Sequence, residues 1–428
     1  MNAPLPAAIG QAWVERLAAS ECPALTTRRK RREEQTGASH DPIVWTEARG
    51  ANVLDVDGNR YVDLTSGFGV AFIGHRHPRV VEALKSQADR LLHALGDLHP
   101  SDRKVELLER LCALSPWRDA RAMLSLSGAD AVTAALKTAV LATGRPGVIA
   151  FEGGYHGLSY GPLAVSGYAE RFRAPFREQL QAKVSFAPWP SDEAGVARTL
   201  AALPHDWSEI GAVILEPIQG RAGVRVPPKG FLATLERISH EHGALLIVDE
   251  IFTGLGRCGS WWRSTEDGAV PDLLCVGKAL GGGLPISACL GKEEVMAAWG
   301  TPDEEAIHTG TFYGDPLGCA AALATLELIE SDGLIDAAAS RGHAFADALR
   351  SSSASGITEV RQAGMLLGLQ LEEPMQALSL ARRLLERGYL VLPAGAEADV
   401  LQLAPPVTLT DAQRDAFIET LVAAMERS

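Results

Sequence analysis

One lysine in a glycine-rich stretch, Lys278, is the residue best placed to do chemistry. It follows the short apolar run 273–276 and precedes three glycines at 281–283, so its amine passes from the end of an expected strand into a loop. A second apolar run, 244–248, ends in Asp249, twenty-nine residues before Lys278. A lysine amine and a carboxylate at two strand ends fit a Schiff-base lysine and a partner for a pyridinium nitrogen.

Other polar side chains also stand at the ends of expected strands. Glu216 directly follows one apolar run, and Tyr155 and His156 follow another after a turn that contains two glycines. Ligands of an open parallel sheet bind at the carboxyl ends of its strands. We therefore expect these side chains to meet Asp249 and Lys278 in one crevice.

A short run of small residues indicates an anion site. Ser127, Gly128 and Ala129 lead directly into a helical pattern over residues 131–142. Ser127 is suited to cap this helix, and the small residues after it leave their N–H groups open to an anion at the positive helix end. An ordinary capped helix explains the same letters, so both interpretations stand at this point.

The elements that must position these residues alternate along the chain. Apolar runs of strand length are separated by stretches with helical periodicity, which predicts an α/β fold with right-handed crossovers and a mostly parallel sheet covered on both faces. Residues 51–64 predict a hairpin, and the serine-rich segment 351–356 predicts a loop. We infer one large central domain and a smaller one assembled from both termini. The expected strands are 147–151, 212–215, 244–248, 273–276 and 287–291, and the expected helices are 105–114, 131–142 and 231–242.

Composition narrows the class of protein. The 428 residues are 46% hydrophobic, enough to bury the cores of two domains, and carry a net charge of −13, which disfavours nucleic acid as a partner. Six scattered cysteines without a CxxC pair predict neither a disulfide framework nor a metal site. We expect a cytoplasmic protein, because no signal peptide or membrane-spanning run is visible. The basic run 28–32 is followed by two glutamates and predicts a solvated helix, with a nucleic-acid or localisation signal as the alternative.

At this point several motifs carry a resemblance to a known family. The chain resembles the class III, or omega-type, pyridoxal-phosphate aminotransferases, whose motifs it carries in the family's order over nearly its whole length. The matching segments are GHRHP from Gly74, SGADAVTAALKTA from Ser127, FEGGYHG from Phe151, EPIQG from Glu216, DEIFTGLGR from Asp249, GKALGGGLP from Gly277 and TGTFYGDPLGCAAALATL from Thr309.

The resemblance implies a fold and an assembly. It implies the fold type I architecture, in which a large domain has a mostly parallel seven-stranded sheet and a smaller α+β domain comes from both termini. The implied divisions are an N-terminal arm and part of the small domain over 1–75, the cofactor-binding domain over 76–325, and the rest of the small domain over 326–428. It also implies a homodimer, or a higher oligomer, whose active sites are shared between subunits.

The resemblance also implies roles for individual residues. Lys278 would form the Schiff base with pyridoxal phosphate, and Asp249 would pair with the pyridine nitrogen. Tyr155 and Ile251 would pack on the two faces of the ring. The backbone N–H groups at the start of the helix and a threonine of the partner subunit would hold the phosphate. The implied cofactor-binding residues are Ser127, Gly128, Ala129, Tyr155, His156, Glu216, Asp249, Ile251, Lys278 and Thr311 of the partner subunit.

The implied reaction is transfer of an amino group from an amino acid or primary amine to an oxo acid or aldehyde. Lys278 would move the proton at the substrate carbon, first as base and then as acid. Family relatives that racemise, epimerise or shift amino groups, or that decarboxylate, remain alternatives. A dehydrogenase is a remote one: Gly254, Gly256 and Gly259 spell GxGxxG, but the motif starts five residues past Asp249 and not at the strand end.

Two departures from the family pattern concern the substrate and the cofactor. Gln402 stands where many relatives have an arginine that clamps a substrate carboxylate and otherwise pairs with the residue matching Glu216. An amide cannot form that charge-assisted fork. We therefore expect 2-oxoglutarate to be a poor acceptor, unless Arg221 supplies the missing charge. Phe252 stands where relatives carry a glutamine that contacts the cofactor's phenolic oxygen.

Overall fold

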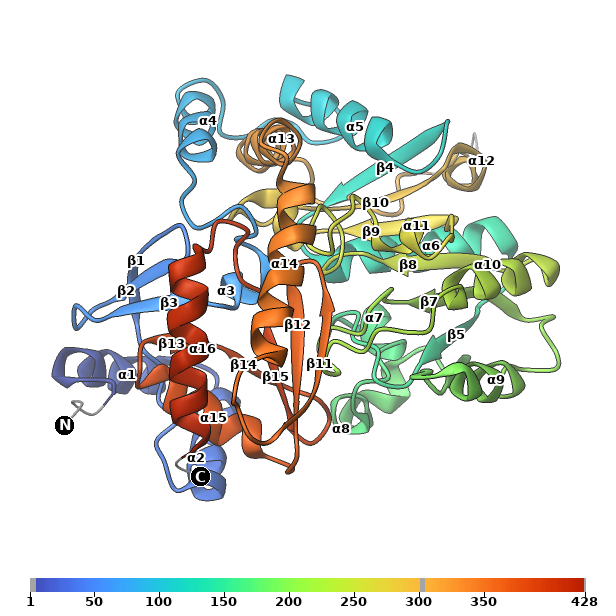
Figure 1. The fold of residues 1–428 in the computed structure, drawn as a ribbon. Helices are drawn as coiled ribbons and strands as arrows, with labels where there is room; N and C mark the ends of the chain where they lie inside the picture. Colours follow the sequence, from blue (N-terminus) through green and yellow to red (C-terminus); the bar gives the residue numbers. More distant parts are fainter. Residues whose placement is uncertain (1–4, 301–304, 427–428) are drawn as a thin grey trace.

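A seven-stranded sheet forms the centre of the larger part of the molecule (Figure 1). The computed structural model describes residues 5–300 and 305–426. In spatial order the strands are β4 (Ala120–Ser125), β10 (Ser287–Lys292), β9 (Leu273–Val276), β8 (Leu245–Asp249), β7 (Ile210–Leu215), β5 (Gly147–Phe151) and β6 (Val184–Ala187).

The direction of the strands confirms the expected topology. Neighbours from β9 across to β6 run parallel, whereas β10 runs antiparallel to both β9 and β4. All five strands expected from the sequence are present. The sequence did not reveal β4 and β6, because β6 is short and both strands carry partly exposed side chains in place of a continuous apolar run.

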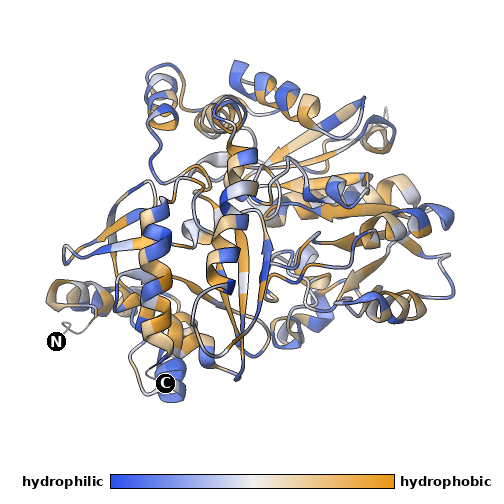
Figure 2. Cartoon of the chain, viewed as in Figure 1, coloured by the Kyte–Doolittle hydropathy of each residue, from blue (hydrophilic) through white to orange (hydrophobic). Residues whose placement is uncertain are grey.

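Helices cover both faces of the sheet, as the alternating pattern predicts. Ala212 and Ile214 of β7 pack against α6 (Gly128–Thr143), whereas the intervening Val213 and Leu215 belong to the cluster under α10 (Phe231–Glu241). Successive side chains of a strand point to opposite faces, so a strand buried on both faces must be apolar throughout. Figure 2 shows this as strands coloured hydrophobic between helices that are hydrophilic on their outer side.

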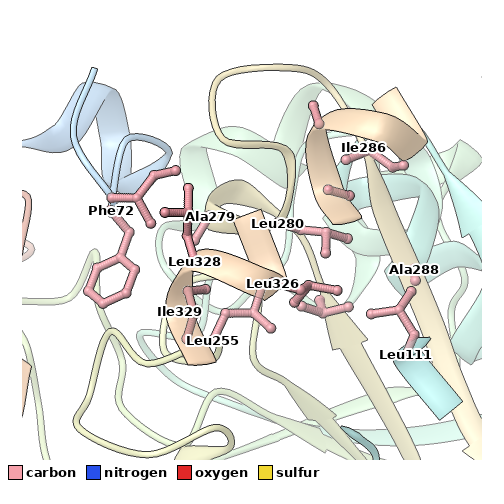
Figure 3. Close-up of a cluster of buried hydrophobic side chains, with 14 of the residues drawn as sticks. Phe72, Leu111, Leu255, Ala279, Leu280, Ile286, Ala288, Leu326, Leu328 and Ile329 are labelled. Atoms are coloured by element: carbon pink, nitrogen blue, oxygen red, sulfur yellow. The ribbon is translucent and has the colours of Figure 1, made fainter. Parts of the chain in front are cut away.

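A third cluster anchors the segment that carries Lys278. Ala279 and Leu280, the two residues after it, are buried with Leu326 and Ile329 of α13 (Pro316–Ser331) (Figure 3). Leu111 of α5 (Asp102–Leu114) and Val80 of α4 (Pro78–Ala88) belong to the same cluster. The lysine backbone is therefore held by the packing of the two residues that follow it.

The smaller part of the molecule contains segments from both termini. Strand β3 (Arg60–Asp63) pairs in parallel with β13 (Tyr389–Leu390), so the N-terminal and C-terminal segments share one sheet. Strands β2 and β3 form the expected hairpin. The domain boundaries expected at 75 and 325 stay a prediction. The first four-stranded sheet runs β1 (Trp45–Arg49), β2 (Asn52–Asp55), β3 (Arg60–Asp63) and β13, and the second runs β11 (Ile357–Ala363), β12 (Leu366–Leu371), β15 (Val400–Leu403) and β14 (Leu392–Ala394).

Helices α14 (Leu334–Arg350), α15 (Gln376–Leu385) and α16 (Asp411–Met425) pack on these two small sheets (Figure 1). Helices α1 (Ala8–Ser20) and α2 (Pro23–Thr36) lie near the N-terminus. The basic run lies on α2 (Pro23–Thr36), which has no fully buried residue, so the expected solvated helix is confirmed. Among the described residues, no helix is long and apolar enough to cross a membrane. The remaining elements are α3 (Ser66–Gly69), α7 (Tyr160–Ala164), α8 (Glu170–Arg173), η1 (Ala174–Gln179), α9 (Glu193–Ala201), α11 (Arg263–Glu266), η2 (Lys278–Gly281), α12 (Glu293–Met296) and η3 (Ala297–Trp299).

Candidate active site

The carboxyl ends of four adjacent parallel strands bring the expected residues together. Lys278 follows β9, Asp249 ends β8, Glu216 follows β7, and Tyr155 and His156 follow β5. These strands are neighbours in that order, so their ends line one edge of the sheet. The crevice expected from the sequence is therefore formed by contiguous strands, as is usual for ligand sites in open α/β sheets.

Lys278 is held in an unusual backbone conformation with its amine unpaired. Its φ is +42°, in the left-handed region that non-glycine residues seldom occupy. Its Nζ lies 4.3 Å from the centroid of the Phe252 ring. It forms no ion pair with any residue that the structure describes. Burial lowers the pKa of the Lys278 amine, against the opposing charges of Asp249 and Glu216. A lysine with a lowered pKa is suited to act as a nucleophile and a base.

Asp249 is fixed in place by two donors. The Ile251 N–H donates to Asp249 Oδ1 over 3.0 Å, and His156 Nδ1 donates to Asp249 Oδ2 over 2.8 Å. Burial alone would lower the pKa of His156, but the hydrogen bond to Asp249 and the charges of Asp249 and Glu216 raise it. His156 Nε2 is buried without a hydrogen-bond partner among the described residues. The carboxylate is thus oriented while each oxygen keeps a lone pair for a further donor.

Glu216 joins two loops of the site without a cation. The Tyr155 N–H donates to Glu216 Oε1 over 2.9 Å, and the Gly220 N–H donates to Glu216 Oε2 over 3.1 Å. Gln402 donates from Nε2 to the Gly220 carbonyl, over 2.8 Å, and not to Glu216. Burial raises the pKa of Glu216 to about 7. Among the described residues, Glu216 therefore accepts from two backbone N–H groups and forms no ion pair with an arginine.

Phe252 fills the space beside the lysine. A Cβ at Gly220 would lie 2.4 Å from the Phe252 ring, and a Cβ at Gly69 would lie 2.5 Å from it. Gly69 also has a φ of +86°. Two glycines are therefore needed for this ring to pack against the backbone, and the phenyl group offers the site no hydrogen bond.

The start of α6 lies at the same edge of the sheet. Ser127 caps the helix through a reciprocal pair of hydrogen bonds with Asp130, and its carbonyl accepts from Ser287 Oγ over 2.6 Å. A Cβ at Gly128 would lie 2.7 Å from Ile251 Cδ1, so only glycine fits where the helix meets Ile251. The first N–H groups of an α-helix have no partner within the helix. Those of Gly128 and Ala129 are positioned to bind an anion.

An arginine and three aromatic rings, of which the sequence indicated only Arg221 and Tyr155, form another wall. The guanidinium carbon of Arg221 lies 4.4 Å from the centroid of the Tyr155 ring and 4.9 Å from that of Tyr168. It lies 5.6 Å from the Phe172 ring of α8. Tyr168 and Phe172 were not expected from the sequence. Their four-residue spacing was a weak signal, because only Phe172 lies within the single-turn helix α8 and Tyr168 precedes it.

Thr311 lies apart from these residues within one subunit. Its side chain is exposed, and its carbonyl lies 3.9 Å from the position a Cβ would take at Gly96. The structure therefore brings all the expected residues together except Thr311, whose implied role is in the site of a partner subunit.

The arrangement fits a planar ring with an anionic tail, and pyridoxal phosphate has that form. The unpaired Lys278 amine can take an aldehyde, and Asp249 can accept from a ring nitrogen. The N–H group of Gly128, at the start of α6, can bind a phosphate. A larger residue at this position would collide with Ile251. Tyr155 and Ile251 can enclose the ring.

Comparison with known proteins identifies the family. The profile of the family described as Aminotransferase class-III matches residues 35–425. The chain is 38% identical over 394 residues to the acetylornithine aminotransferase of Mycobacterium tuberculosis (strain H37Rv), covering 90% of this chain and 92% of that one. It is 35% identical over 382 residues to the acetylornithine aminotransferase of Methanosarcina mazei, covering 89% of this chain and 91% of that one.

Solved structures show the same fold. The amine transaminase from an uncultivated Pseudomonas species, in its PLP-bound form, superposes with a TM-score of 0.84 at 29% identity, covering 90% of this chain and 95% of that chain. The adenosylmethionine-8-amino-7-oxononanoate aminotransferase of Methanocaldococcus jannaschii superposes with a TM-score of 0.85 at 28% identity, covering 91% and 94%.

Proposed function

The chain belongs to the class-III aminotransferase family, and from this premise we propose how its residues carry out the reaction and what they act on. It is a pyridoxal-phosphate-dependent aminotransferase of fold type I. We propose that Lys278 holds the cofactor covalently. The donor is an amino acid or primary amine, and the acceptor is an oxo acid or aldehyde. The observation that carries this is the unpaired, desolvated Lys278 amine beside a carboxylate fixed by His156.

The cofactor, when bound, supplies an electron-withdrawing ring that stabilises negative charge at the substrate carbon. Asp249 would face the ring nitrogen and keep it protonated. His156 holds that carboxylate in one orientation through Nδ1. Tyr155 and Ile251 would hold the ring from its two faces, and the N–H groups of Gly128 and Ala129 would bind the phosphate.

Lys278 then has a second task once a substrate amine has replaced it. Its lowered pKa leaves a larger fraction of the amine unprotonated, so it can remove the proton from the substrate carbon and return it one position away. The packing of Ala279 and Leu280 fixes the lysine backbone while the long side chain moves. Phe252 excludes water on one side of the amine.

An absorption experiment with matched products tests this proposal. The purified holoenzyme should absorb visible light, and an amino donor should bleach it, with an oxo product and a new amine formed in equal amounts. Lys278→Ala should lack both signals, with turnover reduced by at least about 10³-fold because the covalent group and the proton carrier are lost together. Loss of chirality without amino transfer would instead indicate a racemase, and wild-type behaviour of Lys278→Ala would overturn the assignment.

We further propose a homodimer that shares its active sites. Leu98, with 76% of its surface exposed, and Phe312, with 57%, are large apolar side chains in the two segments that flank Thr311. Clustered exposed apolar groups mark interaction surfaces. A partner covering them would bring the partner subunit's Thr311 to the phosphate site. Light scattering on Leu98→Asp should show dissociation and loss of activity together. An unchanged mass and rate would contradict the shared site.

We also propose that the protein works in the cytoplasm. All six cysteines are free. Disulfides are rare in reducing compartments, so free thiols are compatible with that location. Fluorescence microscopy of the tagged full chain tests this directly.

A further inference from the structure

Gln402 and Glu216 form one wall of the site, and among the residues that the structure describes no arginine or lysine side chain forms a salt bridge with Glu216. Gln402 is buried, and its amide is used by the Gly220 carbonyl. Glu216, which bridges Tyr155 and Gly220, would repel a second carboxylate whenever it is ionised. A substrate carboxylate must therefore find a cation elsewhere in the site.

Arg221 directly follows Gly220 in the sequence. Its carbonyl accepts from the Gly395 N–H over 3.1 Å, and the Gly395 carbonyl accepts from the Tyr168 hydroxyl over 3.2 Å. The guanidinium packs over Tyr155, the ring expected to cover the cofactor, as well as over Tyr168. Arg221 is thus fixed from both sides, by the loop that contains Gly395 and by the aromatic rings.

The contacts of Arg221 leave its hydrogen-bond donors available. Contact with an aromatic face uses the positive charge of the guanidinium but not its in-plane N–H groups. In the parts of the chain that the structure describes, Arg221 forms no ion pair. By contrast, Arg257, a fully buried arginine near Lys278, donates to the carbonyls of Met365 and Pro405.

Another arginine, on α2, lies close enough to Arg221 for the two charges to interact. Burial lowers the pKa of Arg32 on α2, and the charges of Arg28, Arg31 and Arg221 lower it further. Burial lowers the pKa of Lys278, the charges of Asp249 and Glu216 oppose this effect, and the charges of Arg257 and Arg221 lower the pKa further, so the field of Arg221 reaches the reacting amine. A positive charge that reaches the reacting centre attracts an anionic substrate group.

We propose that Arg221 is the specificity-determining residue that binds a substrate carboxylate, so that the enzyme prefers amino acids and oxo acids over amines and aldehydes without a carboxylate. This rests on the proposed function, since it names the recognition group of the same site. A planar guanidinium with free N–H groups can make two parallel hydrogen bonds to a carboxylate. Arg221 thereby replaces a charge that Gln402 does not supply.

A structural role for Arg221 predicts a different result. If the arginine only supports Tyr155, its removal should weaken every substrate equally, because the ring would be misplaced for all of them. If it binds a carboxylate, the loss should appear only with substrates that carry one, and in KM more than in kcat.

The test compares substrates that differ by one carboxylate. Alanine is paired with isopropylamine, and 4-aminobutyrate with butylamine, on wild-type holoenzyme, Arg221→Ala and Arg221→Lys. We expect Arg221→Ala to raise KM for the better carboxylate donor by about 10- to 100-fold, the effect of one charge-assisted pair, and to change KM of the matched amine by less than about threefold. Arg221→Lys should fall between. The control is Arg171→Ala, which removes an exposed arginine 5.5 Å from the Phe172 ring and should leave all four donors unchanged.

A binding measurement gives a second readout independent of turnover. Titration calorimetry of the holoenzyme with glutarate, an unreactive dicarboxylate, should show binding that weakens by about 10- to 100-fold in Arg221→Ala. Equal losses for matched donors, or glutarate binding that is absent from the wild type or unchanged in Arg221→Ala, would overturn the role of Arg221. Those results would leave the proposed function intact, which fails only if the wild type lacks visible absorption and amino transfer.

Discussion

The lysine side and the arginine side of this active site are built from different parts of the chain. Lys278, Asp249 and His156 stand at or after the ends of strands in one sheet, and one donor orients each oxygen of the Asp249 carboxylate. On the other side, Gln402 comes from strand β15 of the smaller part, and Arg221 meets the loop at Gly395. The first side places groups for chemistry, whereas the second leaves a cation unpaired.

The lysine side is thus suited to carry out the reaction, and the arginine side is suited to recognise the substrate. Strand ends of a buried parallel sheet are held by packing on both faces, so groups attached to them are positioned within narrow limits. Loop residues that meet another sheet can be exchanged without disturbing that packing. In this chain Gln402, on strand β15, and Arg221, in a turn, both lie outside the strands of the seven-stranded sheet. The following substitutions are arranged to break or sharpen the comparison.

The largest effect is expected on the lysine side, at Asp249. Asp249→Asn keeps the shape but removes the negative charge that faces the ring nitrogen, and turnover should fall by about 10³-fold. Steady-state rates with a saturating donor measure this. Asp315→Asn is the matched control, because Asp315 only caps α13 through the Gly318 N–H, and asparagine caps helices equally well. An Asp249→Asn enzyme that kept more than a tenth of its activity would remove the main distinction between the two sides.

The next effect is a pH dependence of stability that originates at Glu216. Its pKa is raised by burial from 4.5 to about 7, so the folded protein holds a proton that the unfolded chain has released. The stabilisation is full below pH 4.5 and is lost as the pH rises through 7, a change of about 3 kcal/mol in the free energy of unfolding.

Glu216→Gln should remove this part of the slope. Denaturant unfolding at pH 5 and pH 8, with protein and cofactor concentrations held fixed, compares it with the wild type. Glu250 serves as the reference, because burial also raises its pKa to about 7. Glu250→Gln should remove a pH dependence of similar size, although Glu250 forms no hydrogen bond with Gln402, Gly220 or Arg221. Identical slopes in wild type and Glu216→Gln would show that Glu216 is paired with a cation.

A smaller effect is expected at His156, which acts through Asp249. His156→Phe removes the donor to Asp249 Oδ2, and kcat should fall by about 10- to 100-fold, the loss of one hydrogen bond to a charged group. Because the pKa of His156 is raised, its charged form persists to higher pH, and the part of the pH dependence of the rate that comes from this imidazole should be absent from His156→Phe. His156→Asn, which keeps an N–H donor, should recover part of the rate, and equal rates for the two variants would contradict a positioning role.

The smallest effect is expected on the recognition side, at Gln402. Gln402→Leu leaves the buried Gly220 carbonyl without its donor and should lower the free energy of unfolding by about 1–2 kcal/mol. The maximal rate should stay within about threefold, because the amide does not reach the reacting groups. Denaturant unfolding and kcat, measured on the same preparation, check both parts. A large fall in kcat would show that Gln402 affects the reacting groups, which would contradict the distinction between the lysine side and the arginine side.

The lysine side was predictable because its signals are local. An apolar run followed by one polar residue marks a strand end, and the strand before Lys278 has the bounds expected from the sequence, 273–276. The order of strands in the sheet then brings Asp249, Glu216 and Tyr155 together without any further information. The hydrogen bond between His156 and Asp249 could not be foreseen, since it depends on a side-chain orientation fixed by packing.

The recognition side depends on contacts between distant residues. Gln402 and Gly220 are 182 residues apart, and their contact follows from how the second small sheet packs on the crevice. Tyr168 and Phe172 gave little signal, because they lie before and within a single-turn helix whose packing is not periodic. Thr311 is the extreme case, because its expected contacts lie in another subunit.

The attachment of the cofactor to Lys278 is the claim on which both sides depend. Reduction of the holoenzyme with borohydride, followed by digestion and mass spectrometry, locates the attached group. We predict a pyridoxyl group on the peptide that contains Lys278 and on no other lysine peptide. A label on a different lysine, or its absence from an enzyme that still transfers amino groups, would contradict the account.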